Sequence, residues 1–308
     1  MTTQSLEGWL ASQDAATDIS YTVLAIAAAC TEIATAVHHA PLNDHLGEAE
    51  QTNVQGEVQK TLDIICNDVM VQHLQIPPVS ALVSEEIDHV IPVTKGADLV
   101  VCFDPLDGSS NVETNGTIGT IFSVLKVKGE ATADTICAAS HQHVAAGYVL
   151  YGPATLLVLT TGKSVAKFAL DGTFQLVKSD ITIPTTSNEF AINMAYRDRW
   201  DERTSLYIEN CLLGKNGPRG KSFNMRWMGA MVADIHRIFM RGGIFLYPTL
   251  SSPDGPQGKL RLLYEINPLG WMIEIAGGKS IGQGNPDTVH QRAPFIAGSA
   301  DEVEVYLE

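Results

Sequence analysis

The sequence has few cysteines, and they do not cluster. Its 308 residues include five cysteines, which stand far apart at positions 30, 66, 102, 137 and 211 without a CxxC pair or a nearby Cys/His group. The odd number and the wide spacing argue against a disulfide framework and against a structural zinc site. We therefore expect reduced thiols in the core, as is typical of cytoplasmic proteins.

Basic residues and long apolar runs are also scarce. No Lys or Arg precedes Lys60, whereas a secretory signal peptide begins with positive charge and a transit peptide contains arginines. The longest apolar run, residues 23–30, is far shorter than the roughly 20 residues that cross a bilayer. The formal net charge of −15 disfavours contact with nucleic acid or an anionic membrane. The expectation is a soluble, cytoplasmic protein that binds neither nucleic acid nor membrane.

The sequence does contain enough apolar residues for a large core. Hydrophobic residues make up 45% and charged residues 18%, a globular composition that excludes intrinsic disorder. Helical and strand patterns alternate, which predicts an α/β or layered α+β fold. A boundary near residue 185 would divide the chain into domains 1–185 and 186–308. We expect helices at 20–40, 58–74, 201–213, 228–240 and 266–276, and strands at 81–83, 99–103, 118–127, 244–247 and 259–264. We also expect two β runs within 147–160, hinged near 152–153, and a hairpin at 164–177 that turns at 171–172.

The densest group of reactive side chains is the string FDPLDGSSN at residues 103–111. Asp104 and Asp107 follow a buried strand, and Pro105 fixes the backbone between them. Magnesium prefers oxygen ligands, and two rigidly spaced carboxylates with an exposed carbonyl supply part of such a set. A capped Asx turn is the ordinary alternative for one Asp-Gly pair, but the whole string favours a metal site.

The same string continues into a candidate anion site. Gly108, Ser109 and Ser110 offer consecutive backbone N–H groups and two hydroxyls. Such a nest binds phosphate oxygens. Metal ligands that lead directly into an anion nest are the arrangement that hydrolysis of a phosphate ester requires.

Further carboxylates follow other predicted elements. Glu85 and Glu86 end the strand at 81–83, and adjacent side chains of an extended chain point to opposite sides. One could therefore bind a metal while the other contacts water or another ion. Asp63 and Glu57 stand six residues apart at a helix start, where a helix-dipole pair is the alternative interpretation.

The C-terminal half contains a fifth carboxylate and most of the positive charge. Glu265 follows two cations interleaved on the apolar segment 259–264, which could hold metal and phosphate together or form an exposed charged edge strand. Residues 193–265 contain 11 basic residues against seven acidic ones, although the whole chain has 20 against 35. An anionic ligand of an acidic protein needs such a local reversal, which indicates a second phosphate site.

These strings together resemble class I fructose-1,6-bisphosphatase. The resemblance covers about residues 20–300 and rests on LVSEE at 82–86, DPLDGSSN at 104–111, GTIF at 119–122, AGY at 146–148, MVADIHR at 231–237, GGIFLYP at 242–248, GKLRLLYE at 258–265 and NP at 267–268. It implies the five-layer αβαβα sugar-phosphatase fold. It also implies hydrolysis of the 1-phosphate of fructose 1,6-bisphosphate with two or three Mg²⁺ or Mn²⁺ ions, in gluconeogenesis or the Calvin cycle, by a cytoplasmic homotetramer.

The resemblance also assigns roles to residues and to domains. Residues 1–185 would form a metal-site and regulatory-type domain, and residues 186–308 a sugar-phosphate-binding domain. The metal ligands would be Glu85, Asp104, the carbonyl of Leu106, Asp107 and Glu265. The residues acting on the attacking water would be Asp63 and Glu86, with Glu57 in the same catalytic set beside a third ion.

Substrate contacts are implied at both ends of the sugar. The 1-phosphate would be held by Asp107, Gly108, Ser109 and Ser110, with Arg261 nearby. The 6-phosphate pocket would comprise Asn193, Tyr196, Arg226, Tyr247 and Lys259, with Arg226 reaching in from a neighbouring subunit. Trp227 replaces a tyrosine of that pocket, which removes one hydroxyl.

Three alternatives differ in substrate or in class. A sedoheptulose-1,7-bisphosphatase, or an enzyme with both activities, shares the metal site and the DPLDGSS string. An inositol-monophosphatase-like enzyme normally takes its third carboxylate from a Trp-Asp motif, whereas here Glu265 fills that role. An inactive sugar-phosphate-binding protein is the alternative of another class, and the presence of every expected carboxylate argues against it.

Overall fold

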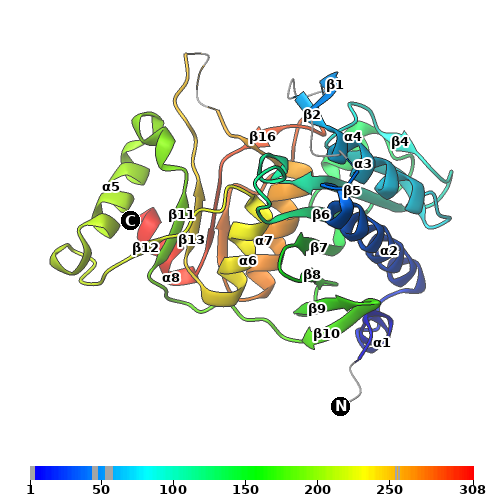
Figure 1. Ribbon diagram of the computed structural model, residues 1–308, viewed down its shortest axis with the longest axis horizontal. Coiled ribbons are helices and arrows are strands. Elements are labelled where there is room, and N and C mark those ends of the chain that lie inside the picture. The colour runs from blue at the N-terminus through cyan, green and yellow to red at the C-terminus, as the bar shows by residue number, and fades with distance from the viewer. Residues whose placement is uncertain (1–3, 44–47, 53–57, 254, 256) are drawn as a thin grey trace.

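The computed structural model describes residues 4–43, 48–52, 58–253, 255 and 257–308. Its layers alternate helices, sheet, helices, sheet and helices, and they can be followed from right to left in Figure 1. The α-helices are α1 (Leu6–Ser12), α2 (Thr17–His39), α3 (Thr61–His73), α4 (Ala133–Ala138), α5 (Glu202–Leu212), α6 (Met231–Arg241), α7 (Asn267–Ile275) and α8 (Ala300–Leu307). The predicted five-layer αβαβα fold is confirmed.

The larger sheet has eight strands in the order β10-β9-β8-β7-β6-β5-β3-β4. Neighbours run antiparallel except for β3 and β5, which are parallel. Helices α1, α2 and α3 cover one face, and α6 and α7 cover the other. The strands are β3 (Val79–Ser84), β4 (Ile91–Pro92), β5 (Leu99–Asp107), β6 (Ile118–Lys126), β7 (His143–Tyr151), β8 (Thr155–Thr160), β9 (Val165–Asp171) and β10 (Thr173–Lys178).

The smaller sheet has five strands in the order β12-β11-β13-β17-β15. It packs on α6 and α7 with one face, while α8 contacts its other face and packs against α5. Its strands are β11 (Glu189–Ile192), β12 (Asn224–Met225), β13 (Ile244–Tyr247), β15 (Lys279–Ile281) and β17 (Phe295–Gly298). Two further pairs are β1 (Glu48–Thr52) with β2 (Val58–Lys60) and β14 (Leu260–Arg261) with β16 (Arg292–Ala293).

One hydrophobic cluster spans the two sheets. Ile121 and Tyr148 of the larger sheet share it with Phe245 and Phe295 of the smaller sheet, and Val232 of α6 lies between them. The two sheets lie on either side of residue 185, but this common core joins them, so the division into two domains stays a prediction.

Three predicted elements differ from the structure. The segment 58–74 is not one helix, because its first three residues form β2 and α3 begins at Thr61. The segment 259–264 is not a strand, because β14 ends at Arg261 and a π-helix, η4 (Leu262–Ile266), follows. The helix expected at 228–240 begins only at Met231.

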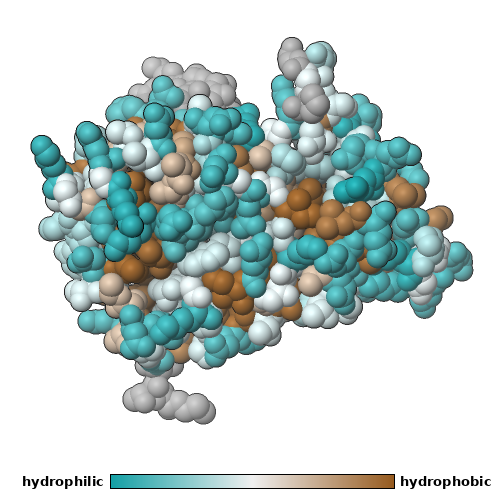
Figure 2. Space-filling model, turned by 180° about the vertical axis from the view of Figure 1, so that it is seen from behind, coloured by the Kyte–Doolittle hydropathy of each residue, from teal (hydrophilic) through white to brown (hydrophobic). Residues whose placement is uncertain are grey.

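Helix α2 extends well beyond the apolar run of residues 23–30. It has 23 residues, with an 18-residue window whose mean hydropathy is 1.5, so by length and composition it is the one helix among the described residues that could cross a membrane. Core helices pass the same test, and here Val23, Ile26 and Ile33 are buried in the hydrophobic core beneath the larger sheet. The face shown in Figure 2 is mainly hydrophilic, with apolar residues in separate patches.

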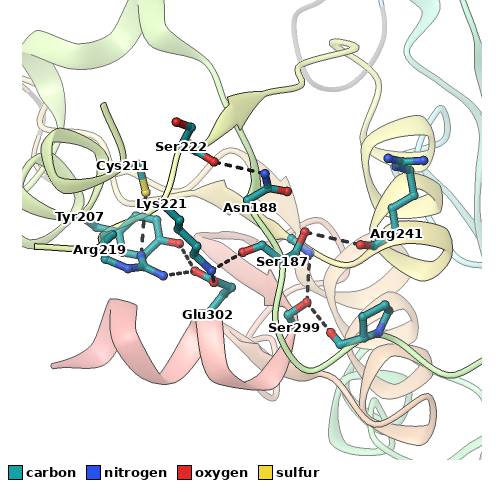
Figure 3. A network of polar contacts seen from close by, with 12 residues as sticks. Ser187, Asn188, Tyr207, Cys211, Arg219, Lys221, Ser222, Arg241, Ser299 and Glu302 are labelled. Carbon is teal, nitrogen blue, oxygen red and sulfur yellow. Dashed lines mark hydrogen bonds and ion pairs between the residues drawn. The ribbon is translucent and has the colours of Figure 1, made fainter. Parts of the chain in front are cut away.

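A polar network ties the C-terminal helix to the segment before β12 (Figure 3). The Glu302 carboxylate, 2% exposed, accepts hydrogen bonds from Arg219 at 2.6 Å, Lys221 at 2.8 Å and the Tyr207 hydroxyl at 3.0 Å. Lys221 also donates to the Ser187 carbonyl at 2.6 Å. Burial alone would raise the pKa of Glu302, but the hydrogen bonds from Arg219 and Lys221 outweigh it and lower that pKa.

We predict that Glu302→Gln lowers the free energy of unfolding at pH 7 by about 3 kcal/mol, because two cations lose a buried carboxylate. Since the folded-state pKa of Glu302 lies below its ordinary value of 4.5, its stabilisation is complete above that pH and is lost as the pH falls through the folded-state pKa. The difference between the two proteins should therefore shrink in acid. Urea unfolding at several pH values measures it.

Glu304 offers a matched control on the same helix. It pairs with Lys279, but these side chains are 58% and 36% exposed, so Glu304→Gln should change the free energy of unfolding by less than about 1 kcal/mol. Equal losses in the two variants would contradict the role assigned to burial.

Candidate active site

A bulge in β5 places two aspartates on the same side of the sheet. In a regular strand, side chains three residues apart point to opposite faces. Here Asp104 pairs with Ile121 and Asp107 pairs with Gly119, so two residues of β5 stand opposite one residue of β6. One of them, Pro105, lacks an N–H for the ladder. The extra residue reverses the alternation, and both carboxylates reach one cavity.

The π-helix η4 brings a third carboxylate to the aspartates. Carboxylate oxygens of Asp104, Asp107 and Glu265 all lie within 4.8 Å of one another. The Glu265 carboxylate also accepts a hydrogen bond from the backbone N–H of Arg261, four residues earlier. Single π-turns are frequent at functional sites, and this one turns Glu265 inward where a continued strand would not.

Glu85 reaches the same place from β3. Because β3 and β5 are parallel, their carboxyl ends lie at the same edge of the sheet. The Glu85 N–H donates to the Phe103 carbonyl at 3.0 Å, which continues the pairing by one residue. The Arg261 guanidinium contacts the Glu85 carboxylate and lies 3.9 Å from that of Glu265.

Burial makes this carboxylate cluster hard to ionise. Desolvation, opposed by the Arg261 charge, raises the pKa of Glu85 and of Glu265 to about 7. Desolvation also raises the pKa of Asp107 to about 7, against the hydrogen bond from Val232. Desolvation and the charges of Glu85, Asp107 and Glu265 raise the pKa of Asp104 well above its usual value.

The donor set fits hard divalent cations. It consists of carboxylate oxygens only, without nitrogen or sulfur, which is the set that Mg²⁺ and Mn²⁺ prefer. A bound cation would remove the mutual repulsion that raises these pKa values. The residues that could hold it are those predicted from the sequence, and Leu106 lines the same cavity.

The anion nest lies beside the carboxylates, at the N-terminus of α6. Gly108 has a φ of 82° and begins the 3-10 turn η1 (Ser109–Asn111). The Val232 N–H, in the first turn of α6, donates to the Asp107 carboxylate at 2.7 Å. Asn111 closes the loop, because its side-chain amide donates to the Met228 carbonyl at 3.0 Å.

One cavity of about 310 Å³ collects most of the predicted residues. Beyond the four carboxylates and the nest, its lining includes Asp63, Glu86, Tyr247, Lys259 and Arg261. Desolvation raises the pKa of Tyr247, opposed by the Lys259 charge. The cavity therefore contains basic as well as acidic side chains.

Three predicted substrate residues are not part of that lining. The Asn193 side chain accepts a hydrogen bond from the Ala195 N–H at 3.0 Å and caps η2 (Met194–Arg199). The Tyr196 ring lies 6.0 Å from the Lys259 ammonium. Arg226 is exposed at the end of β12. Glu57 lies outside the described residues.

The structure places Trp227, which the resemblance put in the 6-phosphate pocket, in the cavity lining with residues to which the sequence gave no role. Trp227 stacks on Phe245 with ring centroids 6.1 Å apart and an interplanar angle of 7°. Gly229, Met231 and Leu260 complete this wall. Of these added residues, Phe245 had a signal in the sequence, because it stands two residues before Tyr247 and therefore shares its face of β13.

Oxygen ligands for a cation, next to a phosphate nest, within a layered α/β fold define a phosphate-ester hydrolase. Comparison with known proteins narrows this class. Residues 1–179 match the family described as fructose-1,6-bisphosphatase, N-terminal domain, and residues 183–308 match its C-terminal domain. The chain belongs to the fructose-1,6-bisphosphatase family.

Individual relatives agree over nearly the full length. The chain is 46% identical to the fructose-1,6-bisphosphatase class 1 of Shewanella halifaxensis, over 99% of this chain and 96% of that protein. The Shewanella baltica protein of the same name is also 46% identical, over 99% and 97%. The holo-form crystal structure of Leishmania major fructose-1,6-bisphosphatase superposes with a TM-score of 0.92 at 31% identity, covering 100% of this chain and 98% of that one.

We predict that Gly108→Ala destabilises the protein more than Gly96→Ala. Both glycines have similar positive φ values, 82° and 88°, so the backbone strain of about 1 kcal/mol is common to both. A Cβ at Gly108 would lie 2.4 Å from the Cβ of Ala230, whereas one at Gly96 meets nothing within 4 Å. The contact should cost a further 1–3 kcal/mol, roughly. Equal unfolding free energies in urea would contradict close packing of the nest against Ala230.

Proposed function

We propose that this chain hydrolyses the 1-phosphate of D-fructose 1,6-bisphosphate, which yields D-fructose 6-phosphate and inorganic phosphate. The observation that carries the proposal is the single cavity. It contains the cluster of Asp104, Asp107 and Glu265, and it also contains Ser109 and Lys259. The carboxylates and the nest would act on the reacting phosphate, and Lys259 with Tyr247 would bind the remote phosphate.

Divalent cations, Mg²⁺ or alternatively Mn²⁺, complete the proposed site. Each active site would bind two or three ions. Glu85, Asp104, the Leu106 carbonyl, Asp107 and Glu265 would hold them. Such ions supply charge stabilisation to the attacking and leaving oxygens of an in-line displacement.

The chain's own residues bind the reacting phosphate and handle the proton. The backbone N–H groups and hydroxyls of Ser109 and Ser110 hold the phosphoryl oxygens, and Arg261 offsets part of their charge. Asp63, which is buried in the first turn of α3, orients the attacking water. A Glu86 carboxylate oxygen accepts its proton. We assign Glu57 to the same catalytic set.

A second group of residues recognises the remote phosphate. Lys259 and the Tyr247 hydroxyl contact it from the same chain, beside Asn193 and Tyr196. Arg226 contacts it from a neighbouring subunit, which fits its exposed position at the end of an edge strand. Binding energy from this phosphate positions the other one for reaction.

We also propose an oligomeric state, a cellular location, domain roles and a pathway for the enzyme. We infer an oligomer, because the proposed site takes Arg226 from a partner, and a homotetramer from the resemblance to the family. A cytoplasmic location suits the five cysteines, which are all free and buried. Residues 1–185 would carry the metal site, apart from Glu265, and any regulation, and residues 186–308 would bind the sugar phosphate. The pathway would be gluconeogenesis or the Calvin cycle.

We predict that Asp104→Asn lowers phosphate release from fructose 1,6-bisphosphate by more than about 100-fold, because it removes a charged ligand at the centre of the cluster. Asp171→Asn, at the tip of the β9–β10 hairpin, is the control and should keep wild-type activity. Phosphate release is measured with and without Mg²⁺. Near wild-type turnover of Asp104→Asn at saturating Mg²⁺ would show that the site is assigned wrongly.

The same assay separates the alternative substrates. Sedoheptulose 1,7-bisphosphate and inositol 1-phosphate are tested beside fructose 1,6-bisphosphate. Comparable rates on fructose 1,6-bisphosphate and sedoheptulose 1,7-bisphosphate would indicate a bifunctional enzyme. A preference for inositol 1-phosphate would overturn the proposed function, because that substrate has no second phosphate for Lys259.

We predict that Arg226 acts across subunits. Arg226→Ala should raise KM for fructose 1,6-bisphosphate about tenfold or more, since a charged hydrogen bond to phosphate is lost. Coexpression with Asp104→Asn should restore low-KM activity, because each Arg226→Ala chain can then receive Arg226 from its partner. In a random mixture, about a quarter of the sites would be complete.

Lys259→Ala provides the matched control. Lys259 lines the same cavity as Asp104 within one chain, so coexpression of Lys259→Ala with Asp104→Asn should restore nothing. Restoration in both mixtures, or in neither, would contradict the assignment of Arg226 to the partner's site.

A further inference from the structure

The bulge in β5 leaves few backbone groups for the sheet ladder. Pro105 has no N–H, and the Leu106 N–H donates to the Asp104 carboxylate at 2.9 Å instead of to β6. The Pro105 carbonyl is therefore a group through which the neighbouring strand can hydrogen-bond to the bulge.

Thr120 of β6 makes that hydrogen bond. It is the single residue opposite Pro105 and Leu106, and it is fully buried. Its hydroxyl donates to the Pro105 carbonyl at 2.9 Å. A buried carbonyl needs such a partner, because it would otherwise lose its hydrogen bond to water without replacement.

The Tyr151 hydroxyl of β7 forms a hydrogen bond with the Thr120 hydroxyl. The two hydroxyl oxygens lie 2.8 Å apart. Since the one hydroxyl hydrogen of Thr120 points to Pro105, Tyr151 is the donor to Thr120. Burial raises the pKa of Tyr151 well above its ordinary value, so the phenol keeps its proton. A buried hydroxyl relay thus runs from β7 through β6 to β5.

We propose that Thr120, supported by Tyr151, is the positioning residue of the Asp104–Asp107 pair. The inference rests on the proposed function, which makes these aspartates cation ligands. Without a donor at position 120, the 105–106 segment loses its attachment to β6. A shift of β5 by one residue toward regular pairing turns one of the two carboxylates to the other face of the sheet.

The test measures Mn²⁺ binding without substrate, by electron paramagnetic resonance of free Mn²⁺ during titration. Thr120→Val keeps the shape of the side chain but removes the donor. It should weaken Mn²⁺ binding by about 10-fold to 100-fold, as is typical when a group that orients metal ligands is lost. Thr120→Ser keeps the hydroxyl and should bind Mn²⁺ within about threefold of wild type. Tyr151→Phe should weaken binding less than Thr120→Val, and adding it to Thr120→Val should cause no further loss.

Ser123→Ala is the matched control on the same strand. Ser123 is also fully buried, but its hydroxyl contacts His143 at 2.9 Å and not β5, so Mn²⁺ affinity should stay unchanged. Circular dichroism during heating confirms that each variant is folded. If Thr120→Val does not fold, Tyr151→Phe decides, because phenylalanine fills the same space without the donor.

The outcomes separate this inference from the proposed function. Wild-type Mn²⁺ affinity in folded Thr120→Val, or in Tyr151→Phe when Thr120→Val does not fold, would overturn the inference alone. Equal losses in Thr120→Val and Thr120→Ser would also overturn it, because packing and not the hydroxyl would then matter. A wild-type chain that binds no Mn²⁺ would overturn both proposals together.

Discussion

Repulsion among buried carboxylates is the constraint on which this structure depends. Burial and the neighbouring charges raise the pKa of Asp104 well above its usual value, and the Arg261 guanidinium contacts the cluster. Such an arrangement is unfavourable unless rigid elements hold it and a ligand relieves it. The central strand β5, the N-terminus of α6 and the π-turn η4 are the elements that hold these oxygens in place.

A second buried carboxylate shows the opposite solution. Glu302 is also 2% exposed, but Arg219 and Lys221 hold it in hydrogen bonds and lower its pKa. A carboxylate that is satisfied within the chain stabilises the fold. Asp104 and Glu265 keep raised pKa values, and a bound cation would stabilise their charged forms. The direction of each pKa shift thus follows the balance between burial and the charged partners of that carboxylate.

The sequence predicted the members of the site better than their geometry. The string at 103–111 is local, and one bulge and one turn bring its aspartates and nest together. A period-two interpretation would nevertheless have placed Asp104 and Asp107 on opposite faces, and only Pro105 hinted at the bulge. The strand expected at 259–264 was wrong, because a π-helix begins at Leu262 and the Glu265 carboxylate accepts a hydrogen bond from the Arg261 N–H. Arg226 stands outside the cavity lining of its own chain, and its proposed role in a partner's site rests on the resemblance and not on a local pattern.

Helix α6 contacts two parts of the cavity lining, the Asp107 carboxylate and the loop that carries Trp227. Its first turn contacts Asp107 of the larger sheet through the Val232 N–H. Its Asp234 carboxylate accepts from the Met228 N–H at 2.9 Å and so fixes the loop that carries Trp227. The side chains of α6 also fill the core between the sheets. The position of the nest on the larger sheet relative to the smaller sheet is therefore fixed by the packing of the layers, which resists compression.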